Sequence, residues 1–265
     1  MSNCQILVFI TYHEDLYEPF YYNDPLFEQY KDNFVFVKVG SNKLKKLKHG
    51  LQQLDLKTLP NYKELGKHYA ESETLYNIFK NGKQYYENVD YVGFLQYDHV
   101  FSAYESTIQK ILLVLSQNPE TISFVSLPME RLFRQTCIID NKMLYEKEMY
   151  FEPILEDYNK FENSNLKISD LMNKSICVSS AFMTKTEIFD GMMKFVNLII
   201  ESSNLDVYDR EMRIPGCFLE RYYGVYLLFN SNSNVKIPLH HYMVSGQNIK
   251  LPYQKLTVES SDFSN

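Results

Sequence analysis

The chain has 265 residues, of which 45% are hydrophobic, so it can bury a substantial core. Its formal net charge of -6 argues against a surface built to bind nucleic acid. No stretch approaches the roughly 18 to 20 consecutive apolar residues that cross a bilayer, and the N-terminus lacks the pattern of a signal peptide, so we expect a soluble, cytoplasmic protein with no membrane span.

Three apolar runs in the first hundred residues predict buried strands. They are CQILVFITY at 4–12, FVFVKVGS at 34–41 and YVGFLQY at 91–97, and none of them alternates with polar residues. Such continuous runs are typical of central strands that are covered on both faces. The basic run SNKLKKLKHG at 41–50 is interpreted as a solvated helix face.

Two helices are predicted on either side of the third strand. The spacing of apolar residues predicts a helix over 69–82 that ends at Gly82. After the strand, Ser102 and Glu105 form an S-x-x-E capping box, and apolar residues at helical spacing follow over 108–115. The pair Asp98-His99 is therefore expected between the end of a strand and the start of a helix.

The second half of the chain continues this alternation of strands and helices. In chain order we predict a strand at 121–128, a mixed and partly helical segment at 145–163, a strand at 175–184, a helix at 188–203 with a Thr184–Glu187 capping box, a helix at 213–232 opened by Pro215 and Gly216, and a strand at 235–246.

Strands that alternate with helices predict an α/β fold, in which a mostly parallel sheet lies between two helical layers as a three-layer α/β/α sandwich. No internal repeat or linker divides the chain, so we expect one domain over 1–250 and a polar tail over 251–265. In such sheets ligands bind beyond the carboxyl ends of the strands. Residues that follow those ends are the candidates for a site.

Asp98 stands at such a strand end. A carboxylate in this position can hold a divalent cation that neutralises a diphosphate, and an imidazole such as that of His99 can share the task. It can equally cap the following turn, because aspartate bonds readily to nearby backbone amides. Spacing alone leaves the two interpretations open.

Glu220 lies in the first turns of the helix that follows Pro215 and Gly216. The helix dipole stabilises an acidic residue there, which explains Glu220 without a catalytic role. Alternatively, a carboxylate held in a cleft can act as a general base. Helical periodicity places Glu220 off the buried stripe, so it can face a cleft or solvent. Three nearby arginines could pair with phosphates or with neighbouring acidic residues: Arg210, Arg213 and Arg221.

Two adjacent histidines, His240 and His241, lie in the last predicted strand. Neighbouring strand residues point to opposite faces, so at most one of them should enter a given site. Neutral imidazole binds manganese or zinc, although a core or surface histidine needs no metal. The cysteines lack the paired spacing of zinc sites, so we expect free thiols in a reducing compartment at Cys4, Cys137, Cys177 and Cys217.

Two blocks of the sequence carry a resemblance to known proteins. The first is YAESETLYNIFKN followed by DYVGFLQYDHVF, and the second is RIPGCFLERYYGVYL. The first resembles a helix ending in Lys-Asn and a strand with an isoleucine- or valine-glycine pair, and the second resembles a helix opened by Gly-Phe-Leu-x-Glu-Arg. These are features of GT-A type glycosyltransferases, more narrowly of the family found in capsular-polysaccharide and lipopolysaccharide clusters and in large DNA viruses. The rest of 4–245 agrees in order and pattern.

The resemblance implies a Rossmann-like GT-A fold that binds a nucleotide-sugar, with UDP expected, in the cytoplasm of a bacterium or a virus-infected cell. It implies that Glu220 is the base and that Asp98, with His240 or His241, holds a divalent cation, expected to be Mn²⁺. The usual Asp-x-Asp is here Tyr97-Asp98-His99-Val100, so the metal site could be weaker, built differently or absent. The implied donor-binding residues are Thr11, Tyr12, His13, Val39, Gly40, Gln96, Tyr97, Asp98 and Arg213.

The leading hypothesis is a hexosyl- or pentosyltransferase that moves a sugar to a hydroxyl of an oligosaccharide or glycoprotein glycan, with inversion. One alternative is a nucleotide-sugar- or glycan-binding protein on the same fold that does not catalyse, suggested by the missing second aspartate. Another is a metal-dependent phosphohydrolase that uses Asp98, His99 and a late histidine. Turnover of a sugar donor separates the three.

Overall fold

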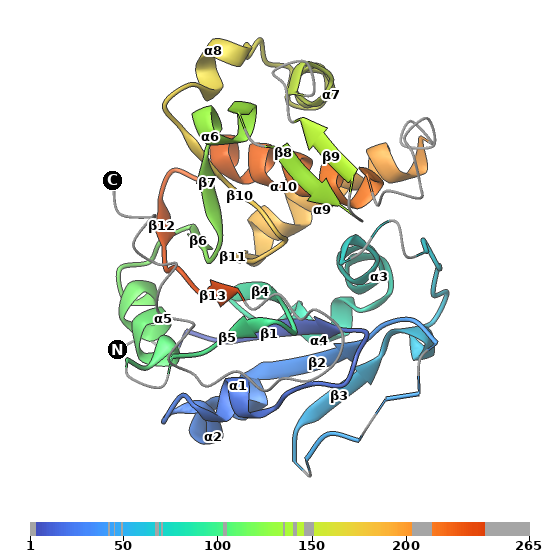
Figure 1. Ribbon diagram of the computed structural model, residues 1–265, viewed down its shortest axis with the longest axis vertical. Coiled ribbons are helices and arrows are strands. Elements are labelled where there is room, and N and C mark those ends of the chain that lie inside the picture. Colours follow the sequence, from blue (N-terminus) through green and yellow to red (C-terminus); the bar gives the residue numbers. More distant parts are fainter. Residues whose placement is uncertain are drawn as a thin grey trace.

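A central sheet of seven strands organises the computed structural model (Figure 1). β1 (Ile6–Tyr12) lies between β4 (Tyr91–Gln96) and β2 (Phe34–Lys38) and runs parallel to both. The strand order is β12-β6-β11-β4-β1-β2-β3. The structure describes residues 4–41, 43–44, 46–48, 50–66, 69, 71–102, 105–134, 136–139, 142–145, 151–202 and 214–241.

The outer strands extend the sheet on both sides. β3 (Gln52–Asp55) runs parallel to β2, and β12 (Asn234–Lys236) runs parallel to β6 (Thr121–Ser123). β11 (Phe182–Lys185) lies between β4 and β6 and is antiparallel to both. The predicted α/β class with a mostly parallel central sheet is therefore confirmed, and β11 is the strand that runs against the others.

Helices cover both faces of the sheet, which makes three layers (Figure 1). Two separate groups of buried side chains, one on each face, join the helices to the strands. The first face carries α3 (Ser72–Asn81), α7 (Phe151–Glu162), α9 (Thr186–Glu201) and α10 (Ile214–Asn230), and the second carries α1 (Pro19–Tyr22), α2 (Phe27–Tyr30) and α5 (Thr107–Leu115).

Short elements complete the described chain. Three two-stranded sheets pair β10 with β7, β13 with β5 and β8 with β9. The remaining bounds are η1 Lys31–Asn33, η2 Leu56–Thr58, α4 Lys83–Tyr86, β5 His99–Val100, β7 Ser126–Pro128, α6 Met129–Arg134, β8 Thr136–Ile139, β9 Lys142–Tyr145, α8 Ile168–Leu171, β10 Ser175–Cys177 and β13 His240–His241.

The continuous apolar runs follow from burial on both faces. All seven residues of β1 are buried, and its apolar side chains alternate between the two cores. Leu7 and Phe9 join the α3–α9–α10 core, while Val8 and Ile10 join the α1–α2–α5 core. Burying each such side chain contributes about 1.5–3 kcal/mol relative to leaving it exposed, so the strand needs no polar face.

The predicted strands β1, β2 and β4 and the helix that ends at Gly82 are confirmed. Gly82 is the C-terminal cap of α3, and its N–H donates to the carbonyl of Ile78 at 2.9 Å. The mixed segment 145–163 contains α7. The helix predicted at 213–232 is α10, with Pro215 and Gly216 in its first turn.

The predicted start of α5 was wrong by one turn. Ser106, not Ser102, caps the helix, and its Oγ accepts from the N–H of Gln109 at 2.9 Å. Buried Asp24, from the loop before α2, accepts from Ser106 Oγ at 2.7 Å and from the N–H of Ile108 at 2.9 Å. This distant carboxylate supplies part of the cap, which no local pattern could reveal.

The three later strand predictions were each wrong in extent, because each segment changes sheets. Segment 121–128 divides into β6 in the main sheet and β7 in another, and 175–184 divides into β10 and β11. Segment 235–246 forms only β12 and β13 over its described part. The expected tail, 251–265, lies outside the described residues.

Two further local predictions were wrong. Thr184 belongs to β11 rather than capping α9, because its hydroxyl lies 2.8 Å from that of Thr121 and donates to the carbonyl of Glu120 at 2.9 Å. The described residues of 41–50 form no helix. Strand β3, which the sequence analysis did not predict, follows them.

Helix α10 is buried on more sides than its periodicity suggested. Residues 221–227 are all buried, because the helix packs against α7, α9, α3 and β10. Gly224 allows this approach: a Cβ at this position would clash with the carbonyl oxygen of Cys177 and lie 3.1 Å from Ile176 Cβ.

We therefore expect Gly224→Ala to destabilise the fold by about 1–3 kcal/mol, although alanine favours helices over glycine. Gly191→Ala in α9 is the matched control, because there the new Cβ meets the end of the Tyr226 side chain rather than backbone. Urea unfolding of both variants measures the difference. A Gly224→Ala protein as stable as the wild type would contradict the close α10–β10 packing.

Candidate functional site

The carboxyl ends of β1, β2 and β4 lie side by side and carry most of the predicted donor-binding residues. Thr11 stands opposite Gln96 in the register, and its carbonyl accepts from the N–H of Tyr97 at 2.9 Å. The N–H of Val39 donates to the carbonyl of Tyr12 at 3.0 Å, which carries β2 alongside β1. The sheet thus brings these segments to one edge, as a parallel arrangement requires.

The turn that carries Asp98 is held by the buried histidine after it. His99 is fully buried, and its Nδ1 accepts from the N–H of Gln96 at 3.0 Å. This bond fixes the turn between β4 and β5 and leaves Asp98 half-buried at its tip. His99 therefore has a structural task in this turn.

Tyr21 lies beneath this turn. Its side chain is fully buried, and its hydroxyl donates to the carbonyl of Tyr97 at 3.3 Å. Burial holds the pKa of Tyr21 well above its usual value, and the negative charge of Asp98 raises that pKa further. Tyr21 therefore stays a neutral hydrogen-bond donor next to the Asp98 carboxylate.

Glu220 is held on α10 by two donors. Its Oε2 accepts from the N–H of Ser179 at 3.2 Å and from Arg221 Nη1 at 3.1 Å. Both members of the ion pair are largely covered, with 18% of the Glu220 side chain and 11% of the Arg221 side chain exposed. Because both side chains are largely covered, removal of either one would leave the charge of the other poorly solvated and unpaired.

Ser179 connects Glu220 to the end of β4. Gln96 Nε2 donates to the carbonyl of Ser179 at 2.8 Å, and the N–H of Ser179 donates to Glu220. Two residues selected separately in the sequence, Gln96 and Glu220, thus contact one backbone residue from opposite sides. This link joins the sheet edge to the start of α10.

Other predicted residues take different positions around the edge. The Tyr12 side chain is fully buried in the core, and its hydroxyl pairs with Gln53 Nε2. The rings of His13 and Tyr97 pack edge to face with their centroids 5.0 Å apart, so these two side chains lie together at the sheet edge. Gly40 is exposed and has a φ of 75°, a conformation that glycine adopts without strain. Arg213 lies outside the described residues.

The late histidines reach the Asp98 turn through strand pairing. β13 runs antiparallel to β5, which places His241 opposite His99 and His240 opposite Val100. Within the described part of the chain, no three histidine, cysteine, aspartate or glutamate side chains gather closely enough to hold a metal ion. The pairing brings the backbone of β13 beside β5, the short strand that follows Asp98.

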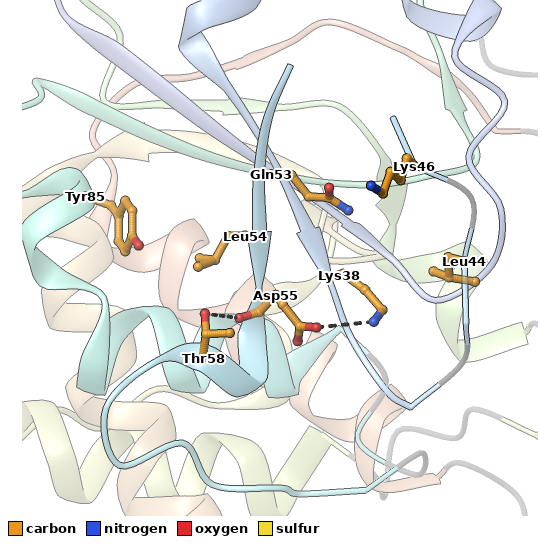
Figure 2. A pocket seen from close by; sticks show the side chains of 8 residues that line it. All are labelled: Lys38, Leu44, Lys46, Gln53, Leu54, Asp55, Thr58 and Tyr85. Atoms are coloured by element: carbon orange, nitrogen blue, oxygen red, sulfur yellow. Dashed lines mark hydrogen bonds and ion pairs between the residues drawn. The ribbon is translucent and has the colours of Figure 1, made fainter. Parts of the chain in front are cut away.

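A cavity of about 490 Å³ lies at the ends of β2 and β3 (Figure 2). Lys38 Nζ and Asp55 Oδ2 form an ion pair at 3.2 Å in it, and Thr58 Oγ1 donates to the carbonyl of Asp55 at 2.7 Å. Gln53, which also lines the cavity, bonds to Tyr12. The cavity thus shares a wall with the predicted donor-binding edge.

Sequence reasoning missed three parts of this region. Ser179 lay inside a predicted strand, and only the Ser-Ser dipeptide hinted at a turn there. Tyr21 and the cavity residue Gln53 lay in segments without a recognised motif. Their importance depends on contacts across the fold, which a local pattern does not encode.

Comparison with known proteins supports the architecture. No protein-family model matches the sequence, and no curated protein matches it significantly. Among solved structures, the apo structure of the bifunctional glycosyltransferase WbbM aligns with a TM-score of 0.53 and 13% identity, over 89% of this chain and 44% of that chain. The chain therefore shares the fold of the aligned part of WbbM.

A second similar structure is the Mn/GDP form of core-mannan synthase A (CmsA/Ktr4) from Aspergillus fumigatus. It aligns over 86% of this chain and 70% of that chain with 8% identity, and its TM-score of 0.41 is too low to bear on this protein. The chain spans less than half the length of WbbM. Among the described helices, none has the length and apolar character to cross a membrane.

Cys177 lies next to the Ser179 turn and should be inert in the folded protein. Burial raises the pKa of its thiol to about 12, and the negative charge of Glu220 adds to the effect. Since the thiolate is the reactive form, we expect iodoacetamide to modify native Cys177 at least about 100-fold more slowly than unfolded Cys177 at pH 8. Peptide mass spectrometry measures both rates, and equal rates would contradict the buried position.

Proposed function

We propose that the protein is a glycosyltransferase that moves a sugar from a nucleoside-diphosphate donor to a hydroxyl of a glycan acceptor. The observation that carries this proposal is the link from Gln96 through Ser179 to Glu220. It holds a carboxylate next to the strand end where ligands of such sheets bind. The fold shared with WbbM supports the same class of reaction by analogy.

On the donor side, the proposal assigns the sheet edge and the neighbouring cavity to the nucleotide. Gln53 and Thr58 offer hydrogen-bonding groups, and Lys46 offers a positive charge in addition to that of Lys38, which is paired with Asp55. The half-buried Asp98 would hold a divalent cation, together with a histidine of β13. When bound, that cation would neutralise the negative charge of the diphosphate. UDP and Mn²⁺ are the expected nucleotide and metal.

On the acceptor side, Glu220 is the proposed general base. It would take the proton of the acceptor hydroxyl as that oxygen forms a bond to the anomeric carbon. The bond between the anomeric carbon and the diphosphate oxygen breaks at the same time, so the nucleoside diphosphate leaves and the configuration inverts. General-base help of this kind contributes roughly 10²- to 10⁴-fold, about 3–5 kcal/mol of the barrier.

Glu220→Gln tests the base directly. Glutamine keeps an oxygen that can accept from Ser179 and Arg221 but cannot take a proton, so donor affinity should be unchanged. We expect transfer to fall about 10²- to 10⁴-fold, measured as nucleotide release with a panel of UDP- and GDP-sugars and oligosaccharide acceptors. Glu187→Gln is the matched control, because Glu187 is exposed at the first turn of α9 near the opposite edge of the sheet.

Wild-type turnover retained in Glu220→Gln would remove Glu220 as the base. If the wild type itself binds a donor saturably but releases no nucleotide, the protein is instead a nucleotide-sugar-binding protein on the same fold.

Asp98→Asn tests the cation. A ligand that binds only the folded state raises its stability, by about 2.7 kcal/mol at a hundred times its dissociation constant. We expect a UDP-sugar to raise the melting temperature of the wild type more with Mn²⁺ than without it, and we expect Asp98→Asn to lose that difference. Asp32→Asn, on η1 before β2, is the control. A difference that persists in Asp98→Asn would place the metal elsewhere.

A further inference from the structure

The turn between β10 and β11 has backbone angles that serine does not favour. Ser179 and Ser180 have φ values of 59° and 47°, and the N–H of Ala181 bonds to the carbonyl of Val178 at 3.4 Å. Two positive φ values at the centre of a hydrogen-bonded turn are typical of type I′, where glycine, asparagine and aspartate dominate. Serine is strained in this conformation, so the surroundings must hold the turn.

Backbone contacts hold the two ends of this turn. The N–H of Val178 donates to the carbonyl of Val125 at 3.0 Å, and the carbonyl of Ala181 accepts from the N–H of Phe124 at 3.0 Å. Both ends are therefore tied to the segment that joins β6 to β7. The middle of the turn is tied differently.

Side chains from two other elements hold the middle of the turn. Gln96, at the end of β4, donates to the carbonyl of Ser179, and Glu220, on α10, accepts from its N–H. A residue in this conformation presents its N–H and carbonyl in directions that a strand residue would not. The strained turn thus lets one backbone residue bridge the sheet edge and the helix.

We propose that Gln96 is a positioning residue, which sets the place of the Glu220 carboxylate through the Ser179 backbone rather than by contact with a substrate. Gln96 is only 8% exposed, and its amide nitrogen is already used by Ser179. Its effect on catalysis rests on the proposed function, whereas its coupling to Glu220 does not. The serine turn is the rigid connection between them.

Gln96→Met tests the catalytic consequence, because methionine has a similar length and no amide. We expect kcat to fall about 10- to 100-fold, since a displaced catalytic group loses its alignment, while the affinity for the best UDP- or GDP-sugar stays within about twofold. Ser179→Gly, which keeps both backbone groups, should retain the wild-type balance of kcat and KM. Gln109→Met, on the exposed face of α5, is the matched control.

A loss of donor affinity in Gln96→Met, with kcat unchanged, would overturn the proposal and make Gln96 a donor contact. A lower stability with unchanged kcat would likewise overturn it, because the role would then be structural alone.

A double-mutant cycle tests the coupling without any activity assay. We expect the fall in melting temperature of Gln96→Met/Glu220→Met to be smaller than the sum of the two single falls, because both changes release the same turn. Additive falls would overturn the link. If a methionine variant does not fold, the hydrogen-exchange rate of the Ser179 amide is measured in Gln96→Asn instead. A rate about tenfold faster than in the wild type supports the link, and an unchanged rate overturns it.

The two experiments separate the two proposals. Non-additive stability in a protein that transfers no sugar would keep the link and remove the proposed function. Additive stability in an active transferase would keep the function and remove the link.

Discussion

The close packing of β4 between β1 and β11 fixes the positions of the residues at the candidate site. β4 is hydrogen-bonded to a parallel strand on one side and an antiparallel strand on the other. Gly93, at its centre, lets both neighbours pack closely, since a Cβ there would lie 3.3 Å from Val8 Cγ2 and 3.4 Å from Met183 Cβ. Because β4 is held so closely, its last residue, Gln96, and the turn after it occupy defined positions.

The antiparallel direction of β11 determines where the second half of the candidate site lies. A strand that pairs antiparallel with β4 begins where β4 ends, so the turn before β11 reaches the carboxyl edge. That turn contains Ser179, and α10 passes beside it because Gly224 lets the helix approach β10. A second parallel strand in this place would have put its preceding turn at the other edge, away from Gln96.

The turn after β4 divides its tasks between two adjacent residues. His99 is buried, and its Nδ1 accepts from the backbone N–H of Gln96 instead of facing the solvent. Strand β13 then lies against β5, with His241 opposite His99. The charge at the turn comes from Asp98, while the histidine supplies rigidity, so the two residues of one dipeptide serve different purposes.

Burial on both faces and helical periodicity are local signals, so the sequence alone predicted the α/β class, the strands β1, β2 and β4, and the helices α3, α9 and α10. Asp98 and Glu220 were candidates from their places at a strand end and near a helix start, whereas Gln96 was a candidate only through the resemblance to glycosyltransferases. Only the tertiary structure decided that strand segments 121–128 and 175–184 change sheets, that Asp24 caps α5, and that Ser179 joins Gln96 to Glu220. Each of these depends on contacts between residues far apart in the chain, which no local pattern records.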